Sequence, residues 1–179
     1  MPSYAAFLRG MNVGGHRLTN DELRAHLEAM GFAEVATFRA SGNVVIAADE
    51  RTPGDVAEHL EGGLEAALGY AVPTFVRSAE QVLAIAAAQP FAPELLESSA
   101  GKLQVGLLTG APSPSVREQA LELAGDSDEL AFDGSELYWL PAGGVLDSGL
   151  DMTVLARLFG AMTIRTHGTI SQLAAKHFA

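Results

Sequence analysis

Apolar and polar positions alternate along the chain in blocks that switch between strand spacing and helix spacing. A continuous apolar run over residues 4–8 predicts a short buried strand. A glycine-rich segment follows, and a helix is predicted behind it. Thr19 and Glu22 have the spacing of a capping box that opens this helix, and Leu23 and Leu27 repeat at helical intervals.

The rest of the first half predicts a hairpin, a helix and a strand. The strands at 35–39 and 44–47 are separated by the turn-forming residues 41–43. Thr52 begins the next helix with a proline in its first turn, and residues 72–77 form a strand. The order strand, helix, strand, strand, helix, strand is that of a ferredoxin-like domain.

The second half predicts the same sequence of elements after one additional helix that begins with a capping box at Ser78 and Gln81. These elements are a strand at 103–108, a helix from Ser113, a hairpin of 130–132 and 137–140, a helix at 151–159, a strand at 163–165 and a helical tail at 169–177. We therefore predict an α+β fold of two packed ferredoxin-like subdomains, 1–77 and 78–179. No repeat between the halves is visible at the level of single residues.

Composition narrows the classes of function. The 179 residues contain no cysteine, which excludes disulfides, thiolate metal sites and a thiol nucleophile. The net charge of −11 argues against nucleic acid as a partner. The apolar runs are too short to cross a bilayer, so we expect a cytoplasmic protein without a membrane partner. The five histidines show no metal-binding spacing, so no metal site is predicted.

Acidic residues are unevenly distributed. None of the 22 acids lies in residues 1–20, 35–48 or 152–179, although these segments contain arginines. This distribution predicts a local positive site for an anion on an otherwise acidic protein.

The same segments carry a resemblance to a known family. Residues 8–15 (LRGMNVGG), 35–45 (VATFRASGNVV) and 163–169 (TIRTHGT) resemble motifs of the largely bacterial family called domain of unknown function 1697. The third motif departs from the family pattern, since Thr166 and His167 stand where the family has Asn-Trp. Gly149 also follows Ser148, where the family often has a lysine. The resemblance implies an α+β fold of two subdomains and no established activity or cofactor.

Within these motifs, we predict a binding site for a small anion bearing a phosphate, nucleotide or carboxylate group. The glycine-rich loop would offer backbone N–H groups, arginines would neutralise the ligand, and asparagines would orient it. The candidate residues are Arg9, Asn12, Gly14, Gly15, Arg39, Ser41, Asn43 and Arg165.

Several alternatives remain open for these residues. The glycines and asparagines can serve the turns alone. The loop matches neither the dinucleotide fingerprint nor the P-loop. Ser41 with His16 or His167 as a base would be a catalytic arrangement, but no nucleophile-elbow motif is present. A non-catalytic interaction module, which self-associates into a homo-oligomer through its sheet edges or binds a partner, is the alternative from another class.

Overall fold

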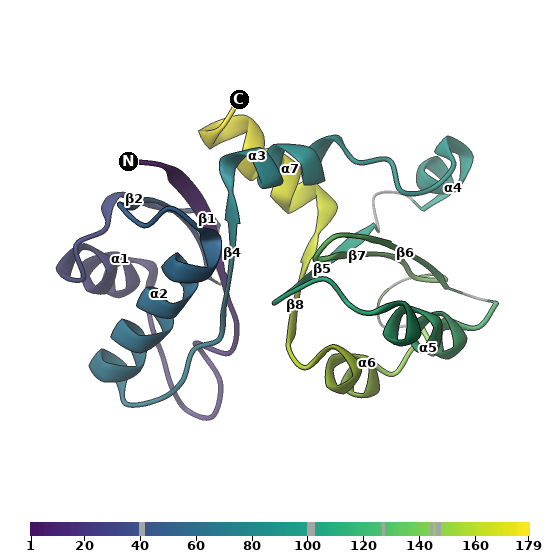
Figure 1. Cartoon of the computed structure of the whole chain (residues 1–179), viewed down its shortest axis with the longest axis horizontal. Helices are drawn as coiled ribbons and strands as arrows, with labels where there is room; N and C mark the ends of the chain where they lie inside the picture. The colour runs from purple at the N-terminus through teal and green to yellow at the C-terminus, as the bar shows by residue number, and fades with distance from the viewer. Residues whose placement is uncertain (40–41, 100–102, 127, 144, 146–147) are drawn as a thin grey trace. The chain divides into compact units, whose positions relative to one another are not determined.

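The computed structural model describes residues 1–39, 42–99, 103–126, 128–143, 145 and 148–179. The chain forms two compact units, Met1–Ala84 together with Leu173–Ala179, and Ile85–Gln172. Each unit contains one four-stranded antiparallel sheet. Figure 1 labels most of their strands and the helices of each unit. The α+β class and the two-subdomain architecture expected from the sequence are confirmed.

The first unit has the strand order β2-β3-β1-β4, which is the ferredoxin-like arrangement. Its elements are β1 (Ser3–Leu8), α1 (Asn20–Ala29), β2 (Ala33–Thr37), β3 (Asn43–Ala47), α2 (Pro53–Leu68) and β4 (Thr74–Ser78). The expected capping box of Thr19 and Glu22 opens α1. Gly31 ends that helix in the left-handed region at φ +95°, as predicted.

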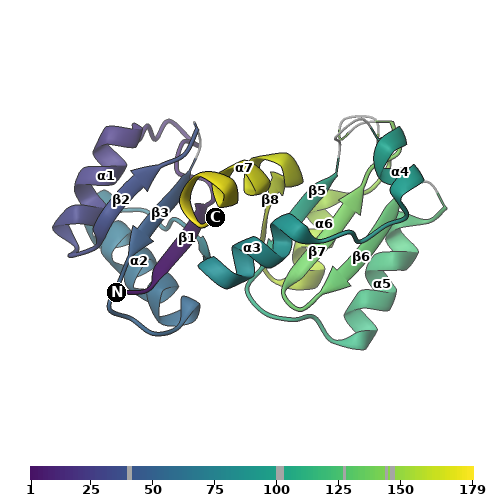
Figure 2. The same ribbon diagram turned by 90° about the horizontal axis from the view of Figure 1, so that it is seen from above.

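One face of this sheet packs against α1 and α2 (Figure 2). Leu23 and Leu27 of α1 and Leu60 of α2 are fully buried in a core that they share with Tyr4 and Ile46 of the sheet. The alternation of side chains along β1 and β3 places every second residue in this core.

The opposite face of the same sheet is also withdrawn from solvent. Ala5, Phe7, Val45 and Phe75 alternate with the core residues and are at most 7% exposed. In RNA-binding domains of this fold, the equivalent face displays aromatic side chains on which bases stack. Phe7 is 0% exposed, so this face offers no such platform.

The second unit repeats the topology with the strand order β6-β7-β5-β8. Its elements are β5 (Gln104–Leu108), α5 (Pro114–Ala124), β6 (Glu129–Asp133), β7 (Glu136–Leu140), α6 (Met152–Phe159) and β8 (Met162–Thr166). Trp139 and Leu155 are buried in its core. The predicted hairpin forms with Asp133 paired to Glu136, so its two loop residues are Gly134 and Ser135.

Among the described residues, three further helices lie outside these repeated topologies. They are α3 (Ala79–Ala87), α4 (Pro93–Ser98) and α7 (His167–His177). The helix α4 was not predicted, because it is short and its first residue follows a position with no side-chain cap. The sequence-based division between residues 77 and 78 falls inside β4, before its last residue, whereas the compact units divide inside α3 and again inside α7.

The strand registers reveal a repeat that the sequence analysis missed. Arg77 in β4 and Arg165 in β8 pair with the equivalent positions Ala5 and Val105 of the central strands. Each guanidinium donates to the carbonyl of the residue before it, at 2.9 Å. The equivalent positions are 100 residues apart between β1 and β5 but 88 apart between β4 and β8. No single offset therefore aligns the two halves of the sequence, and the repeat is not visible in it.

Among the helices of the described residues, none is long and apolar enough to cross a membrane.

Candidate functional site

The glycine-rich segment 9–19 connects β1 to α1, and its backbone is fixed at several points. The Arg9 N–H donates to the Pro73 carbonyl at 2.9 Å. The Leu18 N–H donates to Asn12 Oδ1 at 2.6 Å, and this bond connects the end of the loop to its beginning. The Tyr70 hydroxyl donates to the carbonyl of the buried Met11 at 3.0 Å. These hydrogen bonds therefore fix the backbone of the loop within the first unit.

The tip of the loop is a turn that requires two glycines. The His16 N–H donates to the Val13 carbonyl at 3.1 Å, and Gly14 and Gly15 have φ values of +63° and +84°. Positive φ at both central residues is the mark of a type I′ turn. Within the described part of the chain, the N–H groups of Gly14 and Gly15 have no hydrogen-bond partner.

Two arginines lie in this loop, one at its beginning and one near its end. Arg9 and Arg17 are exposed, and within the described residues their guanidinium groups form no hydrogen bond or ion pair. The imidazole of His16, between the tip and Arg17, stacks on the Tyr70 ring with 3.8 Å between centroids. The loop thus combines positive charge with unused N–H donors and has no acidic side chain.

The second predicted motif meets the first at the end of β1. The Leu8 N–H donates to the Gly42 carbonyl at 2.8 Å, directly before Arg9. A β-carbon at Gly42 would lie 3.0 Å from the Leu8 carbonyl oxygen, so the close approach of these two segments requires glycine there. The expected meeting of the 9–15 loop and the hairpin turn is thus present in the first unit.

Asn43 differs from its expected role in the turn. It is the first residue of β3 and only 4% exposed. Its Nδ2 donates to the Phe38 carbonyl at 3.2 Å, while the Phe38 N–H donates to the Asn43 carbonyl at 2.8 Å. Asn43 therefore closes the hairpin loop, and Phe38 and Arg39 lie outside the strand in which they were predicted. Ser41 lies outside the described residues.

Two cationic side chains and an imidazole lie against the ring of Phe38. Arg39 and Lys176 lie 5.7 and 5.8 Å from its centroid, and His177 meets it edge-on at 6.1 Å. Arg39 has φ +60°, and its carbonyl accepts a hydrogen bond from Asn20. Burial, and to a lesser extent the charge of Lys176, lowers the pKa of His177.

Arg165 belongs to the second unit. Its guanidinium donates to Thr163 Oγ1 at 2.8 Å and to the Ile164 carbonyl at 2.9 Å. Burial lowers the pKa of this half-buried arginine. These bonds give Arg165 a local structural role in β8, and its contact with a ligand stays a prediction.

The other candidate groups are engaged locally or do not cluster. His167 Nε2 lies 2.9 Å from the Ile85 carbonyl oxygen, which makes it the donor and leaves Nδ1 facing Ser171 Oγ at 3.4 Å. Within the described residues, no three His, Asp or Glu side chains come together in a way that could hold a metal ion. Sequence reasoning missed Tyr70 and Pro73 as anchors of the loop, because both are distant from it along the chain.

Comparisons with known proteins agree with this architecture. The family described as "Protein of unknown function (DUF1697)" matches residues 1–138. A conserved bacterial protein from Streptococcus pneumoniae, SP0830, has a similar structure with a TM-score of 0.70 and 21% sequence identity, over 98% of this chain and 99% of that one. No curated protein matches the chain. Since the family match spans most of the chain and includes both motifs of the first unit, the protein belongs to the DUF1697 family.

Proposed function

We propose that the first unit binds a small anion, bearing a phosphate or carboxylate group, at the loop 9–19. The observation that carries this proposal is a difference in length between two equivalent connections. The first unit uses eleven residues, 9–19, between β1 and α1, whereas the second unit makes the same connection with five, 109–113. The fold itself therefore does not require the longer loop.

The chemistry of the additional residues suits an anion. Arg9 and Arg17 supply two positive charges that no described acidic side chain neutralises. Gly14 and Gly15 supply backbone N–H donors, as in the concave anion sites formed by successive amides. Asn12 accepts from Leu18 through Oδ1, and this leaves its Nδ2 as a further donor.

The surroundings of the loop support selectivity for a small ligand. The chain carries a net charge of −11, so a polyanion would be repelled by most of the molecule. The three anchors of the loop lower the entropic cost of ordering it around a ligand. In this proposal Asn43 and Gly42 build the loop's support, and Arg9, Arg17 and Asn12 contact the ligand.

Thermal-shift screening of phosphate- and carboxylate-bearing metabolites tests the proposal. A ligand at about 100 times its Kd should stabilise the protein by about 2.7 kcal/mol. We expect Arg9→Ala and Arg17→Ala to abolish most of this shift. Arg24→Ala is the matched control, because Arg24 is also exposed but lies on α1, outside the loop. Hits that persist in both loop variants would refute the site.

The alternative is a non-catalytic module that self-associates or binds a partner protein. The observation in its favour is that Asn43 and Arg165, both predicted to face a ligand, instead bind local backbone. The edge strand β2 and the 60% exposed Val13 at the loop tip are available for such contacts. A molar mass that rises with concentration in light scattering, and falls to that of a monomer in Val13→Asp, would favour this alternative.

A further inference from the structure

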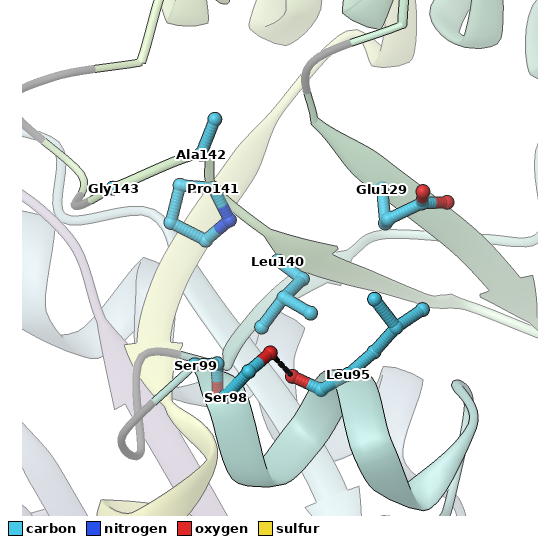
Figure 3. Close-up of a pocket in the computed structure, with 8 residues that line it drawn as sticks. All are labelled: Leu95, Ser98, Ser99, Glu129, Leu140, Pro141, Ala142 and Gly143. Carbon is cyan, nitrogen blue, oxygen red and sulfur yellow. Dashed lines mark hydrogen bonds between the residues drawn. The ribbon is translucent and has the colours of Figure 1, made fainter.

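A cavity of about 260 Å³ lies in the second unit, and none of its lining residues belongs to the loop 9–19. Its lining comes from α4 and the residue after it, from the start of β6, and from the end of β7 with the segment that follows. Figure 3 shows Leu95 extending from α4 toward the β6–β7 hairpin, and Leu140 extending back toward α4. Glu129 at the start of β6 and Pro141 directly after β7 lie across the cavity from α4. The cavity is slightly smaller than the range of about 300 Å³ and above for ligand pockets, so its ligand is small.

The polar groups around this cavity have few hydrogen-bond donors to offer. Ser98 and Ser99 each donate their hydroxyl to a backbone carbonyl of α4, at 3.0 and 2.6 Å. Pro141 has no N–H, and the Ala142 N–H donates to Asp128 Oδ1 at 2.9 Å. These four lining residues therefore have their donors occupied or have none.

Acceptors, in contrast, remain available in the lining, on β6 and, across the cavity, on α4 (Figure 3). The exposed carboxylate of Glu129 forms no hydrogen bond or ion pair with the described residues. The hydroxyl oxygens of Ser98 and Ser99 retain lone pairs. Burial raises the pKa of the neighbouring Asp128, but hydrogen bonds from Ser148, Ala142 and Trp139 outweigh burial and hold it below its usual value. Asp128 thus carries a second negative charge directly before Glu129 in the sequence, bonded to the lining residue Ala142.

We propose that this cavity binds a small primary alkylammonium ion, whose –NH₃⁺ group donates to the Glu129 carboxylate at one side of the cavity and whose aliphatic chain packs on Leu95, Leu140 and Pro141. An ammonium group has three donors and no acceptor, which complements a lining rich in acceptors. The aliphatic chain fits the apolar part of the lining. This proposal is independent of anion binding by the first unit, since the two sites share no residue.

Titration of the full-length ¹⁵N-labelled protein with n-hexylamine near neutral pH, followed by NMR, tests this proposal. We expect shift changes in the amides of α4 and of residues 140–143. Hexanol should bind more weakly and hexanoate more weakly still, because each lacks the positive charge. Glu129→Gln should weaken hexylamine binding about fivefold, as expected for one solvent-accessible ion pair, and leave hexanol binding unchanged. Glu122→Gln, an exposed site on α5, is the control of equal charge and should change neither.

Three results would overturn the proposal. The first is hexanoate binding as tightly as hexylamine, and the second is the absence of shift changes in α4 at tens of millimolar hexylamine. The third is an equal loss of affinity in Glu122→Gln and Glu129→Gln, which would indicate attraction by the net charge rather than a site. A short lysine peptide in the same titration distinguishes the two sources of an alkylammonium group. Tighter binding of the peptide than of hexylamine would show that the ligand is a lysine side chain of a partner protein, and would overturn the proposal of a free amine.

Discussion

Replacing Gly42 by alanine, compared with the same change at Gly69, separates two costs of adding a side chain at a positive-φ glycine. One is backbone strain, and the other is steric contact of the new β-carbon. Gly42 has φ +75°, and a β-carbon there would meet the Leu8 carbonyl oxygen at 3.0 Å and the Leu8 β-carbon at 3.1 Å. Gly69 ends α2 at φ +80° and has open space around the same position. Both glycines lie in the first unit. The pair therefore shares the backbone strain and differs in the steric contact.

The magnitudes follow from these contacts. Left-handed backbone costs a non-glycine residue about 1–2 kcal/mol, and the more restricted unfolded chain offsets about 0.4–1 kcal/mol of that. Gly69→Ala should therefore lower the free energy of unfolding by about 0.5–1 kcal/mol. In Gly42→Ala the close backbone contact adds about 1–3 kcal/mol, for a total of about 1.5–4 kcal/mol.

Urea denaturation followed by far-UV circular dichroism measures both variants. Fluorescence of Trp139, the single tryptophan, reports on the second unit in the same samples. We expect the circular dichroism midpoint of Gly42→Ala to fall well below that of Gly69→Ala. Equal destabilisation by the two substitutions would show that the approach of Leu8 to Gly42 does not constrain the hairpin.

Other consequences of the structure can be tested in the same way. Gly62→Ala should stabilise α2 by about 1 kcal/mol, as judged by urea denaturation, because its β-carbon would meet open space; Gly63→Ala should gain less, because Met30 occupies that position. Asp128→Asn should cost about 2–3 kcal/mol, measured through the fluorescence of Trp139, whose indole N–H donates to Asp128 at 2.8 Å; a native midpoint would refute this role. Burial lowers the pKa of His177 below 6.5, so the unfolded chain binds its proton more readily, and stability is lost as the pH falls below 6.5. His177→Phe should therefore reduce the difference between urea midpoints at about pH 7.5 and pH 5.5, and an unchanged difference would assign that loss to other groups.

The sequence was sufficient to predict most of the fold because the local signals agree with the tertiary structure. Thr19, Thr52, Ser113 and Asp151 each cap a helix where the pattern of polar and apolar residues begins to repeat at helical spacing. The helix α4 escaped prediction because it lacks such a cap.

The candidate site was less predictable, because its organisation depends on contacts between distant residues. The residue types at Gly14 and Gly15 indicated a turn, but the hydrogen bond from Tyr70 to Met11 spans 59 residues and has no local signature. Asn43 was expected in a turn and instead begins β3, since its amide group and its backbone both bind Phe38. Side-chain roles of this kind depend on strand register and on where each strand ends. The pattern of apolar residues does not determine the residue at which a strand begins or ends.

The first sheet has both faces inside the protein, with Phe7 and Phe75 buried on the side opposite its helices. A strand of this kind is under packing constraint at every position, and almost any change in it disturbs a core. The segment 9–19 has no such constraint at its exposed positions. If the loop binds a ligand as proposed, substitutions at its exposed positions would change the ligand preference without disturbing either core.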